Sequence, residues 1–132
     1  MAKLLVKAQA KQGFQVELGI RQHRILADLT PDKGGKDGGP TPPELLLASL
    51  AACSAIFARM FAQREGLPGP VEVQAEAELV DSPMVVRDFR VRVRIAGLPP
   101  EKREKAEAFV GRCVVSQTLC AANAVSLTLE AG

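Results

Sequence analysis

The sequence contains no tryptophan or tyrosine and only five phenylalanines among 132 residues. Proteins that bind single-stranded nucleic acid stack the bases on aromatic rings, so most of the surface for such binding is missing. The sequence also has no large excess of charge of either sign, because 17 Lys+Arg are nearly balanced by 15 Asp+Glu and the net charge is +2. We therefore expect neither a nucleic-acid partner nor an anionic membrane partner.

Long hydrophobic runs are also scarce. The N-terminal stretch MAKLLVKAQAKQGF has no continuous apolar segment and no small-residue cleavage site, so it does not read as a secretory signal, and we expect a cytoplasmic protein. The most apolar stretch, residues 45–62, contains Arg59 and two serines and falls short of the about 20 apolar residues of a membrane span. We interpret it as a buried helix.

Histidine and cysteine are few. His23 is the only histidine, so a Ser-His or Cys-His catalytic pair would have to use it, and we interpret it as a solvent-facing strand residue. Three scattered cysteines and one histidine show no metal-ligand spacing, and we expect no metal or organic cofactor. In a reducing compartment, three cysteines suggest packing residues or reactive thiols rather than a disulfide framework.

The residues that are present predict an α+β fold in a single domain spanning residues 1–132. Three short, partly alternating runs predict an antiparallel meander: residues 3–10, 14–20 and 23–28. Two strictly alternating runs predict a ribbon whose outward glutamates and arginines pair across the strands: residues 71–80 and 89–95. Residues 31–40 are rich in glycine and predict a loop, and residues 124–130 predict a last strand.

A long central helix is predicted from Thr41 to about Glu65. Thr41 and Glu44 have the spacing of a capping box, with prolines between them in the first turn, and Gly66 is a typical helix stop. The first four turns are apolar on every side, so we expect protein to surround the helix.

Two shorter helices are predicted near the C-terminus. The first begins near Pro99, turns Ala106, Phe109 and Val110 inward and is interrupted at Gly111. The second runs over residues 113–122.

The cysteines differ in their surroundings. Cys53 lies within the apolar central helix, whereas Cys113 follows Arg112 at the expected start of a helix, where the cation and the helix dipole favour a thiolate. Cys120 lies about 10 Å further along the same helix, so it cannot bond to Cys113 there. If an intrachain pair forms, Cys53 with Cys113 is the better candidate, and Cys120 is interpreted as a packing residue.

Two segments together are specific enough to suggest a family. One is GGPTPPELLLASLAACSAI, which leads from the loop to Cys53, and the other is CVVSQTL, which begins at Cys113. With the β-rich segments around them they resemble the family of osmotically inducible protein C and the organic hydroperoxide resistance proteins (OsmC/Ohr), over nearly the whole chain. The resemblance implies an OsmC-like fold, in which antiparallel sheets pack around a long buried central helix in an intertwined homodimer.

The resemblance also implies a thiol-dependent peroxidase that reduces organic hydroperoxides in oxidative stress defence. Cys53 would attack the O–O bond and become a sulfenic acid, and Cys113 would resolve it to a disulfide that an external dithiol reduces. Glu44 would correspond to the family's active-site glutamate, which orients an arginine against the thiolate.

Helix geometry bears on the role of Glu44. Cys53 follows Glu44 by nine positions, which is about 13 Å along the axis and the opposite side of the helix. Glu44 can therefore serve only the Cys53 of a second copy, so we expect a site shared between two subunits. As a structural residue, Glu44 would simply cap the helix, and the two roles are compatible.

The chain departs from the family pattern in two places. Val114, Val115 and Ser116 follow Cys113 where the family usually has proline and histidine nearby. The loop before the central helix has lysines instead of the family's arginine, so the basic residue is expected to be Arg24 or Lys36. The missing arginine favours an alternative function: a non-catalytic dimer that binds a small apolar or thiol-bearing ligand between its subunits.

Overall fold

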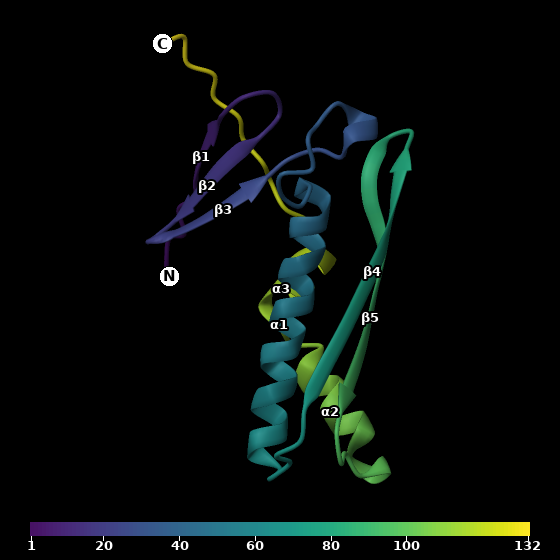
Figure 1. The fold of residues 1–132 in the computed structure, drawn as a ribbon. Helices are drawn as coiled ribbons and strands as arrows, with labels where there is room; N and C mark the ends of the chain where they lie inside the picture. Colours follow the sequence, from purple (N-terminus) through teal and green to yellow (C-terminus); the bar gives the residue numbers. More distant parts are fainter. The chain divides into compact units, whose positions relative to one another are not determined.

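The computed structural model describes all 132 residues, which form two compact units, Met1–Leu47 and Ala48–Gly132. Figure 1 shows the elements in chain order, with three strands, the long helix α1, a two-stranded hairpin and short helices. The fold class is α+β with antiparallel sheets and a long central helix, as predicted.

The first unit contains the predicted meander. Its sheet has the order β1-β2-β3, with every pair antiparallel: β1 (Lys7–Ala10), β2 (Val16–Ile20) and β3 (His23–Ala27). The first strand is shorter than expected, because Leu4 and Leu5 are exposed and pair with no neighbour. A turn closes β1 onto β2 at Gly13, where φ is 61° and the Lys11 N–H donates to the Gln15 carbonyl at 2.7 Å.

The loop after β3 contains a single 3-10 turn, η1 (Pro31–Lys33), before the helix begins. Helix α1 (Pro42–Arg64) starts with the predicted capping box. The Thr41 N–H donates to Glu44 Oε1 at 2.8 Å, and the Glu44 N–H donates back to Thr41 Oγ1 at 3.3 Å. At the other end, Gly66 has φ 70° and the Leu67 N–H donates to the Ala62 carbonyl at 2.8 Å, which ends the helix within one residue of the expected place.

Within the single chain, protein covers α1 on one face, so the expectation of a helix surrounded on every side stays a prediction that depends on a second copy. Its buried residues recur on that face: Leu50, Ser54, Ala58, Phe61 and Ala62. Ile56 and Met60 lie on the other face, with 56% and 48% of their surface exposed. By length and composition α1 could also cross a membrane, but its buried face joins the hydrophobic core of the second unit, which is how a central helix of a globular domain packs.

In the second unit, α1 is followed by a long hairpin of β4 (Val71–Asp81) and β5 (Met84–Ile95), joined at a cis Ser82–Pro83 bond. The register sets Glu72 opposite Arg94 and Glu76 opposite Arg90. Arg90 forms ion pairs with Glu76 at 3.3 Å and Glu78 at 3.6 Å. The predicted cross-strand pairing on the solvated face is therefore confirmed.

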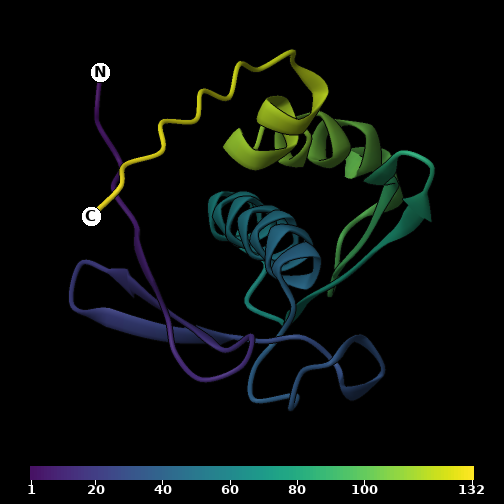
Figure 2. The same cartoon turned by 90° about the horizontal axis from the view of Figure 1, so that it is seen from above.

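Three helical pieces complete the second unit: η2 (Pro100–Lys102), α2 (Arg103–Val110) and α3 (Val114–Cys120). Figures 1 and 2 show α2 and α3 beside α1. Phe109 of α2 packs its ring 5.7 Å from that of Phe57 and 5.9 Å from that of Phe61. Ala106 is buried, and Phe109 and Val110 pack against the same core, so the predicted inward face of α2 is confirmed.

The strand predicted over residues 124–130 is absent, and this prediction is wrong for the single chain. Residues 122–132 form no secondary structure. Val125, Leu127 and Leu129 each leave more than 90% of their surface exposed. The alternation that suggested a strand is real, but no neighbouring strand in this chain supplies the hydrogen bonds that a strand needs.

Candidate functional site

The second unit brings Cys53 and Cys113 together. Cys53 lies in the middle of α1 and is half-buried, while Cys113 caps the start of α3 and is fully buried, with 0% of its surface exposed. A hydrogen bond joins their side chains, and both thiols are free. The fold therefore places in contact two sulfur atoms that lie sixty residues apart in the sequence.

Burial raises the pKa of the Cys113 thiol above its ordinary value. The Ser116 N–H, which donates to Cys113 Sγ at 3.4 Å, lowers this pKa in part. Interaction with Cys53 raises it further, and a hydrogen bond from the Ser54 hydroxyl lowers it. The net direction is upward, so Cys113 remains a protonated thiol at neutral pH.

This result corrects the expectation that Arg112 and the helix start would favour a Cys113 thiolate. The Arg112 guanidinium lies over the Phe109 ring, 5.2 Å from its centroid. At the start of α3, only the Ser116 N–H donates to Cys113 Sγ and lowers the pKa. The loss of hydrating water on burial raises the pKa by more.

A cavity of about 470 Å³ lies beside the cysteine pair in the second unit. Ser54 and Ser116 form part of its wall, and neither cysteine lines it. The rest of the wall comes from β5, α2, Leu98 and Gly111, and it is apolar apart from three charged side chains: Arg92, Arg103 and Glu107. The two serines therefore stand between this cavity and Cys113.

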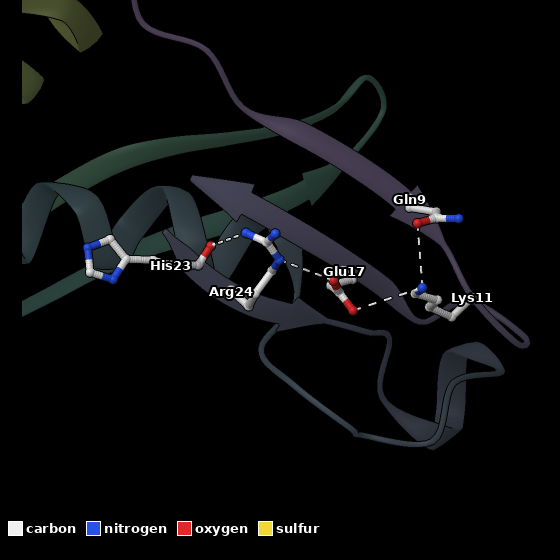
Figure 3. A network of polar contacts seen from close by, with 5 residues as sticks. All are labelled: Gln9, Lys11, Glu17, His23 and Arg24. Atoms are coloured by element: carbon white, nitrogen blue, oxygen red, sulfur yellow. Dashed lines mark hydrogen bonds and ion pairs between the residues drawn. The ribbon is translucent and has the colours of Figure 1, made fainter. Parts of the chain in front are cut away.

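Glu44 and the two candidate cations lie in the first unit. The Glu44 carboxylate accepts from both the N–H and the hydroxyl of Thr41, and these bonds lower its pKa. Figure 3 shows Arg24 on β3, where it pairs with Glu17 at 3.5 Å and donates to the carbonyl of His23 at 3.1 Å. Lys36 is exposed in the loop. The structure does not pair Glu44 with either cation, and the basic partner remains a prediction.

Asp28 is a buried residue that sequence reasoning missed. It directly follows β3, with only 2% of its surface exposed, and its carboxylate accepts from three backbone N–H groups: Leu29 at 2.7 Å, Gly38 at 3.0 Å and Lys36 at 3.3 Å. The bonds from Gly38 and Leu29 lower its pKa. An acidic residue at the end of an apolar strand, before a glycine-rich loop with free amides, was the signal that could have identified it.

The remaining candidates lie away from the pair. His23 is exposed on β3, as predicted, and Cys120 is exposed at the last residue of α3, so it is not the packing residue that we expected.

Comparison with known proteins decides the family. The model of the family described as OsmC-like protein matches residues 34–130, which include Cys53, Cys113 and the whole of α1. The chain belongs to the OsmC-like family. None of the curated proteins matches it.

Solved structures of OsmC-like proteins have the same fold. The OsmC-like protein of Mycoplasma pneumoniae is 21% identical, with a TM-score of 0.77 over 90% of this chain and 88% of that one. An organic hydroperoxide resistance protein OsmC of Legionella pneumophila is 22% identical, with a TM-score of 0.67 over 90% of each chain. The organic hydroperoxide resistance protein OhrB of Bacillus subtilis is 17% identical, with a TM-score of 0.60 over 89% of this chain and 90% of that one. At these identities the likeness establishes the fold.

Proposed function

We propose that this OsmC-like protein is a cytoplasmic, thiol-dependent peroxidase that reduces organic hydroperoxides. The Cys53 thiolate attacks the terminal peroxide oxygen, the O–O bond breaks, and the alkoxide takes a proton to leave as an alcohol. Cys53 is then a sulfenic acid. The Cys113 sulfur attacks Cys53 Sγ and expels water, giving a disulfide that an external dithiol reduces to two thiols while it becomes a disulfide itself.

The observation that carries this proposal is the contact between Cys53 and Cys113. Their different environments support a division of roles. Cys53 is half-buried and accessible to a substrate, whereas Cys113 is fully buried and stays protonated, so its S–H can donate to the Cys53 sulfur before reaction. The contact also removes the need for a large movement when the disulfide forms.

The surroundings of Cys53 favour an apolar hydroperoxide. The exposed side chains near Cys53 on α1 include two large apolar ones, Ile56 and Met60. An alkyl group gains free energy by leaving water for such a surface, which hydrogen peroxide cannot do.

We further propose that the active protein is a homodimer. The uncovered face of α1 and the unpaired segment 124–130 both leave large apolar side chains in water, and exposed apolar patches mark interaction surfaces when they are contiguous. A second copy packed on α1 in the opposite direction would cover this face and bring its own Glu44 to Cys53. Glu44 would then orient a cation, Arg24 or Lys36, against the thiolate.

Replacement of Cys53 tests the proposal. Cys53→Ser should abolish reduction of cumene hydroperoxide with a dithiol as reductant, while Cys120→Ser, which changes an exposed thiol away from the pair, should retain it. Undiminished turnover by Cys53→Ser would end the hypothesis.

One observation favours the second candidate, a non-catalytic dimer that binds a small apolar or thiol-bearing ligand at the subunit interface. Arg24 is already paired with Glu17, and Glu44 is bonded to Thr41, so neither of these two groups is held ready for a thiolate in the single chain. Brief exposure to cumene hydroperoxide separates the two functions. A peroxidase loses two hydrogens per chain at Cys53 and Cys113, whereas a binding protein keeps its thiols.

A further inference from the structure

The burial of the two sulfur atoms bears on how the disulfide is reduced. We propose that the regenerating thiol attacks Cys53 and that Cys113 is always the sulfur that leaves, with Ser54 stabilising it as it departs. This inference rests on the proposed function, because it concerns the disulfide that the peroxidase cycle would form.

Access decides which sulfur is attacked. A thiolate must approach a disulfide sulfur directly, and Cys113 has no exposed surface. The cavity of about 470 Å³ gives no route to it, because Ser54 and Ser116 line the wall and Cys113 does not. Cys53 is half-buried on α1, and any opening that admits a hydroperoxide to Cys53 also admits a thiol.

The leaving group works against this route. A thiol of high pKa leaves slowly, and burial raises the pKa of Cys113. Two donors reduce that cost, the Ser116 N–H at 3.4 Å and the Ser54 hydroxyl, since both hydrogen bonds favour negative charge on Cys113 Sγ. Access therefore fixes the direction of attack, and the donors determine its rate.

The step is balanced without a further reagent. The thiolate of the reductant bonds to Cys53 Sγ, the Cys53–Cys113 bond breaks, and the electron pair goes to Cys113 Sγ, which then takes a proton from solvent. A second thiol attacks the reductant's sulfur in the mixed disulfide and releases the Cys53 thiolate. The reductant is oxidised to a disulfide.

Glutathione can show which cysteine is attacked. The Cys120→Ser protein is oxidised with diamide, which joins neighbouring thiols whether or not the protein is a peroxidase, and is then exposed briefly to glutathione. The reaction is then quenched, the protein is unfolded so that the buried thiol becomes accessible, the freed thiol is labelled with N-ethylmaleimide, and both adducts are located by mass spectrometry. We expect glutathione on Cys53 and maleimide on Cys113. Glutathione on Cys113, an equal division, or no Cys53–Cys113 disulfide with diamide would overturn the inference.

The proposed function can fail separately, because it requires that cumene hydroperoxide also forms the disulfide. If diamide forms the disulfide and the hydroperoxide does not, the peroxidase proposal fails while the direction of attack still stands.

Ser54→Ala tests the stabilising role, with Ser54→Thr as the matched variant that restores a hydroxyl. Loss of one neutral hydrogen bond should slow reduction by glutathione about fivefold. It should also move the ionisation of Cys113, followed by thiolate absorbance in the reduced protein, to higher pH, an effect that does not depend on the access of a reagent. Threonine should restore both. An unchanged pH profile in Ser54→Ala would show that Ser54 does not act on Cys113.

Discussion

Cys113 experiences two opposing influences on its sulfur. Loss of water favours the neutral thiol, while donors from Ser116 and Ser54 favour the charged form, and the first is larger. In the proposed peroxidase, the resolving step needs the thiolate of Cys113, because a thiol is a weak nucleophile. The environment of this one side chain therefore links the speed of disulfide formation to pH.

We predict that disulfide formation after a stoichiometric pulse of hydroperoxide accelerates with pH. The pKa of Cys113 is raised, so its thiolate fraction should grow about tenfold per pH unit from about pH 7 to about pH 9. Rapid acid quenching and mass spectrometry of the Cys120→Ser protein would follow the reaction. Cys113→Ser should stop at the sulfenic acid. A rate that does not change across this range would contradict the prediction.

The buried carboxylate of Asp28 should make the stability of the fold depend on pH. Its pKa is lowered in the folded protein, so the folded state binds fewer protons than the unfolded chain as the pH falls toward the ordinary carboxyl value. The stabilisation is therefore present above that value and is lost as the pH drops below it. Asp28→Asn should lower the urea midpoint at neutral pH and make its acid dependence shallower. The exposed Asp37→Asn is the control, and equal behaviour of the two would refute the role of Asp28.

At the scale of elements, the contact between α1 and α2 holds the scaffold of the cysteine pair. Phe109 packs against Phe57 and Phe61, and the Arg64 guanidinium lies 4.8 Å from its ring centroid. Glu65, just beyond α1, forms ion pairs with Lys102 and, at 3.8 Å, with Lys105. These contacts fix α2 and hence the start of α3, where Cys113 lies.

Phe109→Ala should destabilise the protein by about 2–3 kcal/mol, below the usual cost for a fully buried phenylalanine because this ring is half-buried. Val114→Ala, at a side chain 65% exposed, should change stability by less than about 0.5 kcal/mol. Urea unfolding measures both. A Phe109→Ala midpoint like that of Val114→Ala would show that this contact is not important for stability.

The elements that could be predicted from the sequence are those specified by local chemistry. Thr41 with Glu44 starts α1 and Gly66 ends it, because capping and a left-handed glycine depend on near neighbours. The pKa direction of Cys113 could not be predicted, since it depends on burial by distant residues. The strand predicted over residues 124–130 does not form in the single chain, because a strand needs a partner and no pattern within those residues shows whether one is present.

At the scale of the whole molecule, the uncovered face of α1 is the feature that the proposed dimer explains. Ile56→Glu would place a charge where a second helix should pack, and burial of an unpaired charge is costly. We predict that the wild type sediments at twice the chain mass and Ile56→Glu at the chain mass. Met84→Glu, at a side chain 67% exposed near the hairpin turn, should remain dimeric. A monomeric wild type would refute the dimer and the shared site.

The bare segment after α3 has a practical consequence for handling the protein. The stretch from residue 122 onward has no strand beside it, and its apolar side chains lie in water. Its backbone is therefore accessible to contaminating proteases. If the proposed dimer covers this stretch, dilute preparations would be cleaved there first, with α1, Cys53 and Cys113 left intact. A slightly shortened band on a gel after storage would then indicate chains that had been monomeric.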